Sequence, residues 1–412
     1  MNNLPKISTN RKRRVICIPI DEKEYNQIIL EAKKFRGLLQ VLILAHKELF
    51  PKEIENGYLM KEIRLSKKES VLIRRIKVKK TNISYTIRPS FVMPYMAGRV
   101  KDVKTALFMR KFSVPFWALT QAFGRNNMYW YRLFVSFGRL NVVASTVKTK
   151  EIPKDLSADE KHSKQCGEKV YIPVTVANDC ILGASVTTSA STEMLKLGYG
   201  DFKNDVLQAN PEYTPKTVNT DGWRATHGAW NYLFSSITII FCFLHLYIKI
   251  RDRCKKKNKN IFEKVSDRFW LCFDAKSQGS FSQRVRRLHE WAHQNIKIKI
   301  ICERLDKLRK NLSSYSCAYK QPSGHRTSTS VDRVIKRMDR YLFNMMYFHG
   351  SQTASRLHIR AWAIFHNFWL FNPATRRKHN GQICFAEKFN GVRYHDCWLQ
   401  NLLISSSVDC SP

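Results

Sequence analysis

Three aspartates that are far apart in the chain lie in contexts that could place their carboxylates around one metal ion. Asp221 directly follows a short apolar strand that contains Val218, and Gly222 provides the turn behind it. Asp159 follows a second short strand, and Asp332 lies in the first turn of an amphipathic helix. A carboxylate at the C-terminal end of a strand in an open α/β sheet points into the crevice where ligands bind. We therefore expect these three side chains to converge.

The chemistry expected of such a cluster depends on metal ions. Clustered carboxylates stay ionised only when positive charge neutralises them. Mg²⁺ does this with few protein ligands and keeps its other positions for water and phosphate oxygens. Two such ions, roughly 3.5–4 Å apart, activate the attacking oxygen and stabilise the leaving oxygen of an in-line displacement. We predict that Asp159, Asp221 and Asp332 bind Mg²⁺, with Mn²⁺ as a substitute, and catalyse phosphoryl transfer on a nucleic-acid backbone.

Two other acids compete for places in this cluster. Asp179 is an alternative first acid, but Asn178-Asp179 is typical of a turn between two strands. Glu303, on an expected helix, is the alternative third acid. We prefer Asp332 because a polar loop that ends in helix-capping residues precedes it.

A Cys-x-x-His pair, Cys242 and His245, follows the strand expected at residues 237–241. The two side chains are three positions apart near the start of a helix, where they could bind Zn²⁺. A structural zinc site needs four ligands, and the sequence has no second pair at metal-binding spacing. We interpret the pair as structural, or as orienting the acidic cluster.

The secondary-structure pattern predicts an α/β fold around these residues. A strand that ends at Asp159, a polar turn at 161–167, and strands at 170–176 and 181–186 form an antiparallel meander. A helix at 193–208 crosses back to the strand before Asp221. Mainly helical sequence follows to residue 319, and Ser330 is then expected to cap the helix that carries Asp332.

The first 141 residues are expected to be basic and rich in helix. One helix is predicted at 22–49, and a second is predicted to be capped by Ser113 and to end at Gly124. Asn126 or Asn127 caps a third helix, which carries Trp130 and Arg132. Two short helices joined through glycine suit a helix-turn-helix reader of DNA, although aromatic residues at this density also fit a packed core.

The charge balance points to a polyanionic partner. The chain carries 71 Lys and Arg against 33 Asp and Glu, a net charge of +38, spread along its whole length. Neutralising phosphates releases counterions and drives association with nucleic acid. A merely basic or ribosome-associated protein remains an alternative on charge alone. The candidate DNA contacts are Arg125, Trp130, Arg132, Lys255, Lys256, Lys257, Trp291 and Arg326.

Cysteine usage and hydropathy predict a cytoplasmic, nucleoid-associated protein with no membrane partner. The 11 cysteines include no Cys-x-x-Cys pair, which favours a reducing compartment, and no signal peptide precedes residue 14. Residues 225–248 lack Asp, Glu, Lys and Arg, but their dense apolar part is only 237–248. A run of this length is more typical of a core element than of a bilayer span.

These motifs together resemble the DDE/DDD transposases of bacterial insertion sequences. The resemblance rests on LSADEKH around Asp159, VNTDGW around Asp221, CFLH at 242–245 and RTSTSVDR around Asp332, and covers about residues 142–348. It implies a ribonuclease-H-like mixed sheet with helices on both faces, interrupted before the last acid by a helical insertion. The implied division is a DNA-binding region (1–141), the first part of the core (142–255), the insertion (256–325), and the last helices with a tail (326–412).

The resemblance also implies an activity and partners. Such an enzyme binds double-stranded DNA, both transposon ends and target, as a homo-oligomer, and performs Mg²⁺-dependent strand cleavage and strand transfer. Two departures stand out, because most relatives carry Glu where Asp332 stands, and often Asn where Thr329 and Ser330 stand. A non-catalytic DNA-binding protein, either a repressor or an inactive transposase, is therefore the alternative, and a structure-selective nuclease is a third hypothesis.

Overall fold

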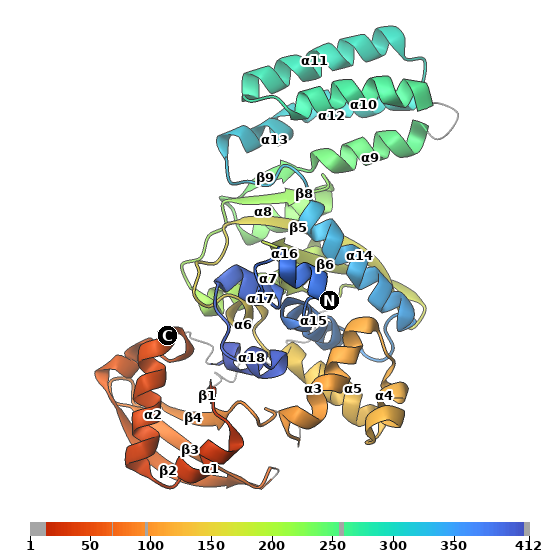
Figure 1. The fold of residues 1–412 in the computed structure, drawn as a ribbon. Helices are drawn as coiled ribbons and strands as arrows, with labels where there is room; N and C mark the ends of the chain where they lie inside the picture. Colours follow the sequence, from red (N-terminus) through yellow and green to blue (C-terminus); the bar gives the residue numbers. More distant parts are fainter. Residues whose placement is uncertain (1–13, 68, 95–97, 255–258, 408–412) are drawn as a thin grey trace.

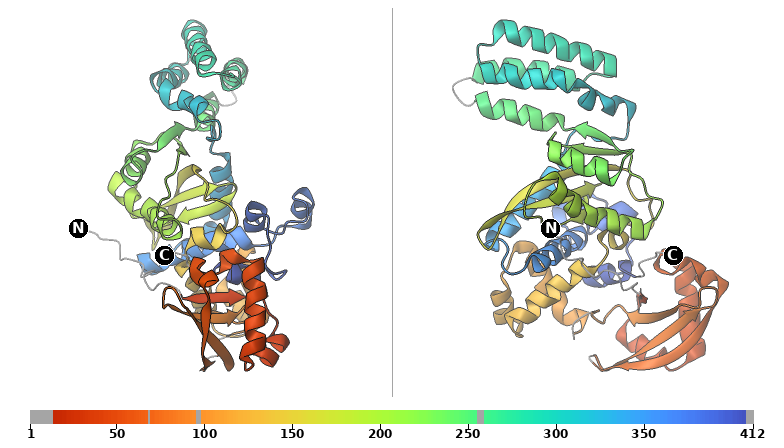
Figure 2. Two further views of the ribbon diagram at one scale, coloured as in Figure 1. Left: turned by 90° about the vertical axis from the view of Figure 1, so that its left-hand side faces the viewer. Right: turned by 180° about the vertical axis from the view of Figure 1, so that it is seen from behind.

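The predicted α/β class is confirmed by the computed structural model, which describes residues 14–67, 69–94, 98–254 and 259–407. Two mixed β-sheets are each accompanied by helices. A four-stranded sheet lies at one end of the molecule, a five-stranded sheet in the middle, and a bundle of helices at the other end (Figures 1 and 2). None of the described helices is both long enough and apolar enough to cross a membrane.

The N-terminal region contains a four-stranded sheet, and the sequence indicates only one of its strands, because Ile76-Lys77-Val78-Lys79 alternates as a strand does. Its strand order is β1-β4-β3-β2, with β1 parallel to β4 and the other pairs antiparallel. The helix expected at 22–49 is two helices, and Asp21 caps the first by accepting hydrogen bonds from Lys23 and Glu24. Residues 14–94 therefore combine helices with a four-stranded sheet, where the sequence analysis expects mainly helix. The elements are β1 (Val15–Ile18), α1 (Glu22–Ile28), α2 (Ala32–Ala45), η1 (Lys47–Leu49), η2 (Lys52–Asn56), β2 (Tyr58–Ser66), β3 (Val71–Val78) and β4 (Ser84–Pro89).

A short helical segment connects this sheet to the centre of the molecule. Ser113 does not cap a helix, because it adopts a left-handed conformation and Pro115 occupies the N-cap position of α4 instead. Asn126 caps α5 as expected, accepting a hydrogen bond from the backbone N–H of Tyr129. The elements are α3 (Val100–Met109), η3 (Arg110–Phe112), α4 (Phe116–Phe123), α5 (Asn127–Ser136), η4 (Phe137–Arg139) and α6 (Val142–Thr146).

The central sheet has the strand order β7-β6-β5-β8-β9. Strands β5, β6 and β7 form the expected antiparallel meander, and β8 and β9 are added parallel to β5 on its other side. The helix that crosses back to β8 also lies where it was predicted. The elements are β5 (Asp155–Gln165), β6 (Glu168–Ala177), β7 (Cys180–Ala184), α7 (Thr192–Ala209), β8 (Thr217–Thr220), α8 (Arg224–Leu233) and β9 (Thr238–Phe241).

Strand β5 is longer than predicted and does not end at Asp159. It continues to Gln165, paired with β6 throughout, so only the last residues of the expected polar turn form a turn. Side chains alternate along a strand. Accordingly, Asp159 and Lys161 lie on the face covered by α14 (Thr329–Asn344), where Lys161 pairs with Asp339. Glu160 lies on the opposite face, under α7 and α8.

Buried ion pairs tie α7 to the long C-terminal helix α15 (Gln352–Phe368). Arg356 pairs with Asp201 at 2.7 Å, and Arg360 pairs with Asp205 at 2.9 Å. Arg360 also donates to the backbone carbonyl of Gly138, so its buried charge is fully engaged. Three short helices complete the C-terminal region: α16 (Pro373–Lys378), α17 (Phe385–Asn390) and α18 (Trp398–Ser405).

The helical insertion, residues 243–320, separates β9 from α14 and has a hydrophobic core of its own. Phe243 on its first helix stacks on Phe269 with ring centroids 4.1 Å apart. The unit therefore includes a helix that the sequence analysis assigns to the preceding part of the core. Its elements are α9 (Phe243–Cys254), α10 (Lys259–Phe273), α11 (Gln278–Asn295), α12 (Lys299–Lys310), α13 (Leu312–Ser316) and η6 (Cys317–Lys320).

Two glycines of α7 provide a matched test of how this helix packs on the sheet. A Cβ at Gly198 would lie 2.4 Å from Cγ of Pro173 in β6, whereas a Cβ at Gly200 would have no atom within 4 Å. We predict that Gly198→Ala lowers the free energy of unfolding by about 1–3 kcal/mol through overpacking. Gly200→Ala should raise it by roughly 0.5–1 kcal/mol because alanine is the better helix former. Urea denaturation measures both, and equal effects of the two substitutions would contradict this packing.

Candidate active site

The three predicted aspartates meet on one face of the central sheet, beside its inner strands β5 and β8. In the parallel pair β5–β8 the last matched residues are Ser157 and Asn219, and Asp159 and Asp221 each lie two positions further along. Asp332 lies in the first turn of α14, which packs on the same face. The carboxylate of Asp159 is close enough to interact electrostatically with both of the others, and Asp332 interacts with Asp221. Residues separated by more than 170 positions thus form one site.

His245 lies between two of these carboxylates. Its Nε2 is 3.9 Å from Oδ2 of Asp159 and 3.9 Å from Oδ1 of Asp332. One donor atom from each of the three residues lies within 4.8 Å of the other two. The imidazole, carried by the first turn of α9, therefore bridges the strand acid and the helix acid.

Ser328, which the sequence analysis did not single out, holds this arrangement together. Its hydroxyl donates to Oδ2 of Asp332 at 3.0 Å, and lies 3.2 Å from Nδ1 of His245 and 3.1 Å from Sγ of Cys242. Because its one proton points to Asp332, the hydroxyl accepts from Nδ1–H of His245, which leaves Nε2 facing the carboxylates. Ser328, not Ser330, is the N-cap residue of α14. The Cys-x-x-His pair thus contacts the third acid through this serine.

The electrostatics of the site show a shortage of positive charge. Burial, with the charges of Asp221 and Asp332, raises the pKa of Asp159 to about 6, although the charge of His245 opposes this. Burial also raises the pKa of Asp332. Burial lowers the pKa of His245, but its hydrogen bond to Cys242 and the charges of Cys242, Asp159 and Asp332 outweigh burial and raise it to about 9. At neutral pH the imidazolium therefore offsets part of the carboxylate charge.

This donor set fits a divalent cation. Carboxylate oxygens are the ligands that Mg²⁺ and Mn²⁺ prefer. Crowded carboxylates with raised pKa values are the groups that a cation would stabilise in the ionised form. A cation held by Asp159, Asp221 and Asp332 would take over the neutralising role that His245 has in this structure.

Asp221 has two further neighbours. Its Oδ1 accepts a hydrogen bond from the backbone N–H of Trp223 at 2.9 Å, and the intervening Gly222 has φ +89°, so the predicted glycine turn is present. Lys249 on α9 places its ammonium 3.8 Å from Oδ2 of Asp221. The lysine side chain is 44% exposed, so it can also reach an incoming anion.

Glu160 supports the site from the opposite face of the sheet, a role that the sequence analysis did not predict. Its carboxylate accepts hydrogen bonds from the hydroxyls of Tyr199 on α7, at 2.7 Å, and Thr226 on α8, at 2.6 Å. Burial, aided by the charges of Asp159 and Asp221, raises its pKa to about 7 although both hydrogen bonds lower it. Glu160 therefore joins β5 to two helices directly beneath Asp159.

The two competing acids lie elsewhere. Asp179 is in the turn between β6 and β7 with φ +66°, as expected for a turn residue, and pairs with Arg333 and Lys388. Glu303 is exposed on α12 in the helical insertion. Of the two candidates for the third acid, Asp332 is therefore the one that lies beside Asp159.

The predicted DNA-contacting residues divide into exposed and buried ones. Arg125 and Arg132 are exposed on the α4–α5 segment. Trp130 is buried, with its indole N–H donating to the carbonyl of Gly124, so the structure contradicts its prediction as a DNA contact. Lys255, Lys256 and Lys257 lie outside the described residues.

The two candidates in and beside the helical insertion are engaged within the protein. Trp291 is half-buried, with the guanidinium of Arg268 4.0 Å from its ring centroid. Arg326 donates to the hydroxyl of Tyr319 and lies 4.2 Å from the ring centroid of Phe273. The backbone of the same loop accepts hydrogen bonds from Asn219, at His325, and from Phe243, at Arg326 itself. Arg326 and its loop therefore stabilise the junction of the insertion with α14.

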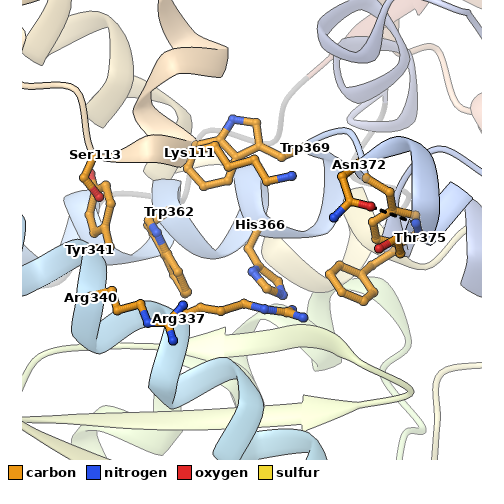
Figure 3. A pocket seen from close by; sticks show the side chains of 12 residues that line it. Lys111, Ser113, Arg337, Arg340, Tyr341, Trp362, His366, Trp369, Asn372 and Thr375 are labelled. Atoms are coloured by element: carbon orange, nitrogen blue, oxygen red, sulfur yellow. Dashed lines mark hydrogen bonds between the residues drawn. The ribbon is translucent and has the colours of Figure 1, made fainter.

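A separate cavity of about 320 Å³ lies between α14, α15 and the segment after α3 (Figure 3). Cationic and aromatic side chains line it, including Lys111, Arg337, Trp362 and His366, and none of its lining residues carries a carboxylate. Burial and the nearby cations lower the pKa of His366 to about 3, so its ring is neutral. The cavity shares helix α14 with the aspartates but adds no group to their site.

No protein-family model matches the chain, and no curated protein matches it.

The raised pKa of Glu160 predicts a pH-dependent stability. Its ordinary value is 4.5 and its value in the folded protein is about 7. The stabilisation from protonated Glu160 is therefore fully present below pH 4.5 and is lost as the pH rises through 7. Between pH 4.5 and 8, wild type should lose on the order of 3 kcal/mol relative to Glu160→Gln, which cannot ionise. Urea denaturation at both pH values tests this, and a pH-independent difference between the two proteins would refute it.

Proposed function

We propose that this protein is a DNA transposase of the DDE/DDD type, which binds terminal inverted repeats and catalyses Mg²⁺-dependent strand cleavage and strand transfer. The observation that carries the proposal is the meeting of Asp159, Asp221 and Asp332, with His245 between Asp159 and Asp332. Two adjacent strands, with Asp159 within β5 and Asp221 directly after β8, and one helix supply three carboxylates, a ligand set suited to metal-assisted phosphoryl transfer.

The topology of the central sheet supports a ribonuclease-H-like core. Numbered within this sheet, the spatial order β7-β6-β5-β8-β9 is 3-2-1-4-5, with the second strand antiparallel to the first. The helical insertion separates β9 from the helix that carries the third acid. Both features agree with what the resemblance to insertion-sequence transposases implies.

The charge of the protein supports DNA as the substrate. A net charge of +38 favours binding to a phosphate backbone through counterion release. Exposed Arg125 and Arg132 on α4–α5 provide cations on one segment, and Lys249 provides one beside Asp221. DNA affinity should therefore fall steeply with salt, whatever the DNA sequence.

The residues of the site have distinct roles in this proposal. Asp159, Asp221 and Asp332 hold the divalent ions, which when bound supply Lewis acidity and charge neutralisation for the displacement at phosphorus. His245 orients the carboxylates of Asp159 and Asp332, and Ser328 fixes which nitrogen of His245 faces them. Lys249 binds a phosphate oxygen next to Asp221.

The third acid is Asp rather than Glu, and its position accounts for the shorter side chain. Asp332 is in the first turn of its helix, and its Oδ1 lies 3.9 Å from the Nε2 that also faces Asp159. The carboxylate therefore reaches the site without the additional methylene. This observation favours an active enzyme over an inactive, DNA-binding relict.

Replacing one ligand separates catalysis from DNA binding. Asp221→Asn should lower Mg²⁺-dependent nicking at the inverted repeats that we expect to flank the reading frame by roughly 10²–10³-fold or more, the scale of losing one electrostatic group from an active site. Binding of the same DNA in a gel shift should be retained. The control is Asp252→Asn, an exposed aspartate on α9 that pairs with Arg251.

The same assay distinguishes the alternatives. Undiminished nicking by Asp221→Asn would refute the assignment of the site. Binding without nicking by wild type in either Mg²⁺ or Mn²⁺ would identify a non-catalytic DNA-binding protein. Nicking without joined strand-transfer products would identify a nuclease.

The role of Ser328 predicts a weaker but specific defect. Ser328→Ala removes the hydroxyl that orients His245 and Asp332, and should lower turnover by about 10–100-fold, as is typical for residues that orient metal ligands. The pH profile of cleavage should also shift, because His245 loses its partner at Nδ1. Thr329→Ala, at the neighbouring exposed position, is the control and should behave as wild type. Equal activities and pH profiles for the two variants would contradict the role given to Ser328.

A further inference from the structure

A second cluster of potential metal ligands lies in the helical insertion, away from the aspartates. His289 and His293 are four residues apart on α11, so both side chains emerge on the same face of the helix. The sequence does therefore contain a further pair at metal-binding spacing, contrary to the expectation from the sequence analysis. Their ring centroids are 4.4 Å apart. Asp306 faces them from the next helix, α12.

The packing of the two helices fixes this register. Leu288 and Ala292, next to the histidines, are buried in the core of the insertion, as are Leu305 and Leu308 on either side of Asp306. The link between the helices is short, residues 296–298. The three polar side chains are therefore held together by the apolar contacts beneath them, and do not depend on their own attraction.

The donor atoms converge on a single point. Nε2 of His289 lies 2.7 Å, and Nε2 of His293 2.8 Å, from the same Oδ1 of Asp306. One donor atom from each residue lies within 4.8 Å of the other two. Donors around a tetrahedral zinc ion are about 3.3 Å apart, since each bond is about 2.0–2.1 Å long. An opening of about half an ångström would admit the ion.

The exposure of the cluster permits that opening. The side chain of His289 is 16% exposed, whereas those of His293 and Asp306 are 45% and 48% exposed. The more exposed pair can rotate at little cost, and the solvent side leaves a coordination position for water.

We propose that His289, His293 and Asp306 bind a transition-metal ion of the zinc class and thereby tie α11 to α12. Two imidazoles and one carboxylate suit Zn²⁺, Co²⁺ or Ni²⁺, whereas Mg²⁺ prefers an all-oxygen set such as the three aspartates of the central sheet. The proposed ion has three protein ligands and a water in the fourth position, its role is to cross-link the two helices, and the proposal is independent of the activity proposed above.

Arg309 contacts His289, one of the proposed ligands, and would oppose metal binding there. Its Nη1 lies 3.3 Å from Nδ1 of His289. A guanidinium only donates, so Nδ1 is the acceptor and Nε2 carries the proton that faces Asp306. Metal binding at Nε2 moves the proton to Nδ1 and displaces Arg309, which is exposed and free to swing away.

His289-Glu290-x-x-His293 has the spacing of a metallopeptidase motif, in which the glutamate is the general base for hydrolysis. Glu290 is not placed for that role. Glu290 is exposed, and its carboxylate lies 3.8 Å from Nε of Arg286, one turn earlier on α11. The glutamate is thus paired away from the histidines. We accordingly assign the ion a cross-linking role.

Cobalt titration of the full-length protein, stripped with EDTA, tests the site. Co²⁺ bound by two imidazoles, a carboxylate and water should give visible absorption bands that Zn²⁺ abolishes. His293→Ala should bind one ion fewer than wild type, or bind it at least tenfold more weakly, and Zn²⁺ should no longer raise its Tm by the wild-type amount. Glu290→Gln is the matched control and should keep both responses.

Arg309→Ala gives a prediction of opposite sign, because removing the competitor should tighten Co²⁺ binding several-fold. Comparison with His293→Ala also separates this site from any ion held by the aspartates of the central sheet, which that variant leaves intact. The proposal is overturned if wild type and His293→Ala bind the same number of Co²⁺ ions with the same affinity. It is equally overturned if Zn²⁺ stabilises the two proteins to the same extent.

Discussion

Mutual repulsion between three carboxylates beside the inner strands β5 and β8 of the central sheet is the constraint on which the rest of the structure depends. Asp159, Asp221 and Asp332 are brought together by two strands and a helix, and burial raises the pKa values of Asp159 and Asp332. An imidazolium with a raised pKa offsets part of that charge in this structure. A site that needs more positive charge than the protein supplies is one suited to divalent cations and to a phosphate backbone, and the strongly cationic chain is consistent with both.

The scaffold holds these charges in place from both faces of the sheet. On one face, Ser328 couples His245 to Asp332 at the start of α14, so the entry to that helix and the Cys-x-x-His turn form one unit. On the other face, Glu160 connects β5 to α7 and α8. The helical insertion leaves the core after β9, and Arg326 stabilises the junction where it rejoins the core before α14.

The elements with strong periodicity were predictable, and those defined by distant partners were not. Helix α14, strand β8 before Asp221 and the crossover helix α7 could each be predicted from the spacing of apolar residues within the segment itself. Strand β5 was cut short because its second half is polar, and it is a strand only because β6 pairs with it. Apart from the alternation at residues 76–79, the N-terminal sheet was missed, since most residues of β2 are exposed and show no apolar alternation. Ser328 was not predicted because its partner Cys242 is 86 residues away in the chain. Ser328 also lies among several other serines and threonines, and nothing in the sequence distinguishes it from them.

The most direct test of the central claim is a crystal structure of the protein, from crystals grown with Mn²⁺. The anomalous scattering of Mn²⁺ distinguishes the ion from water and lighter ions. The account predicts an anomalous peak about 2.0–2.3 Å from carboxylate oxygens of Asp159 and at least one of Asp221 and Asp332. A structure in which these three side chains point apart, or in which Mn²⁺ occupies other residues and leaves them without an ion, would contradict it.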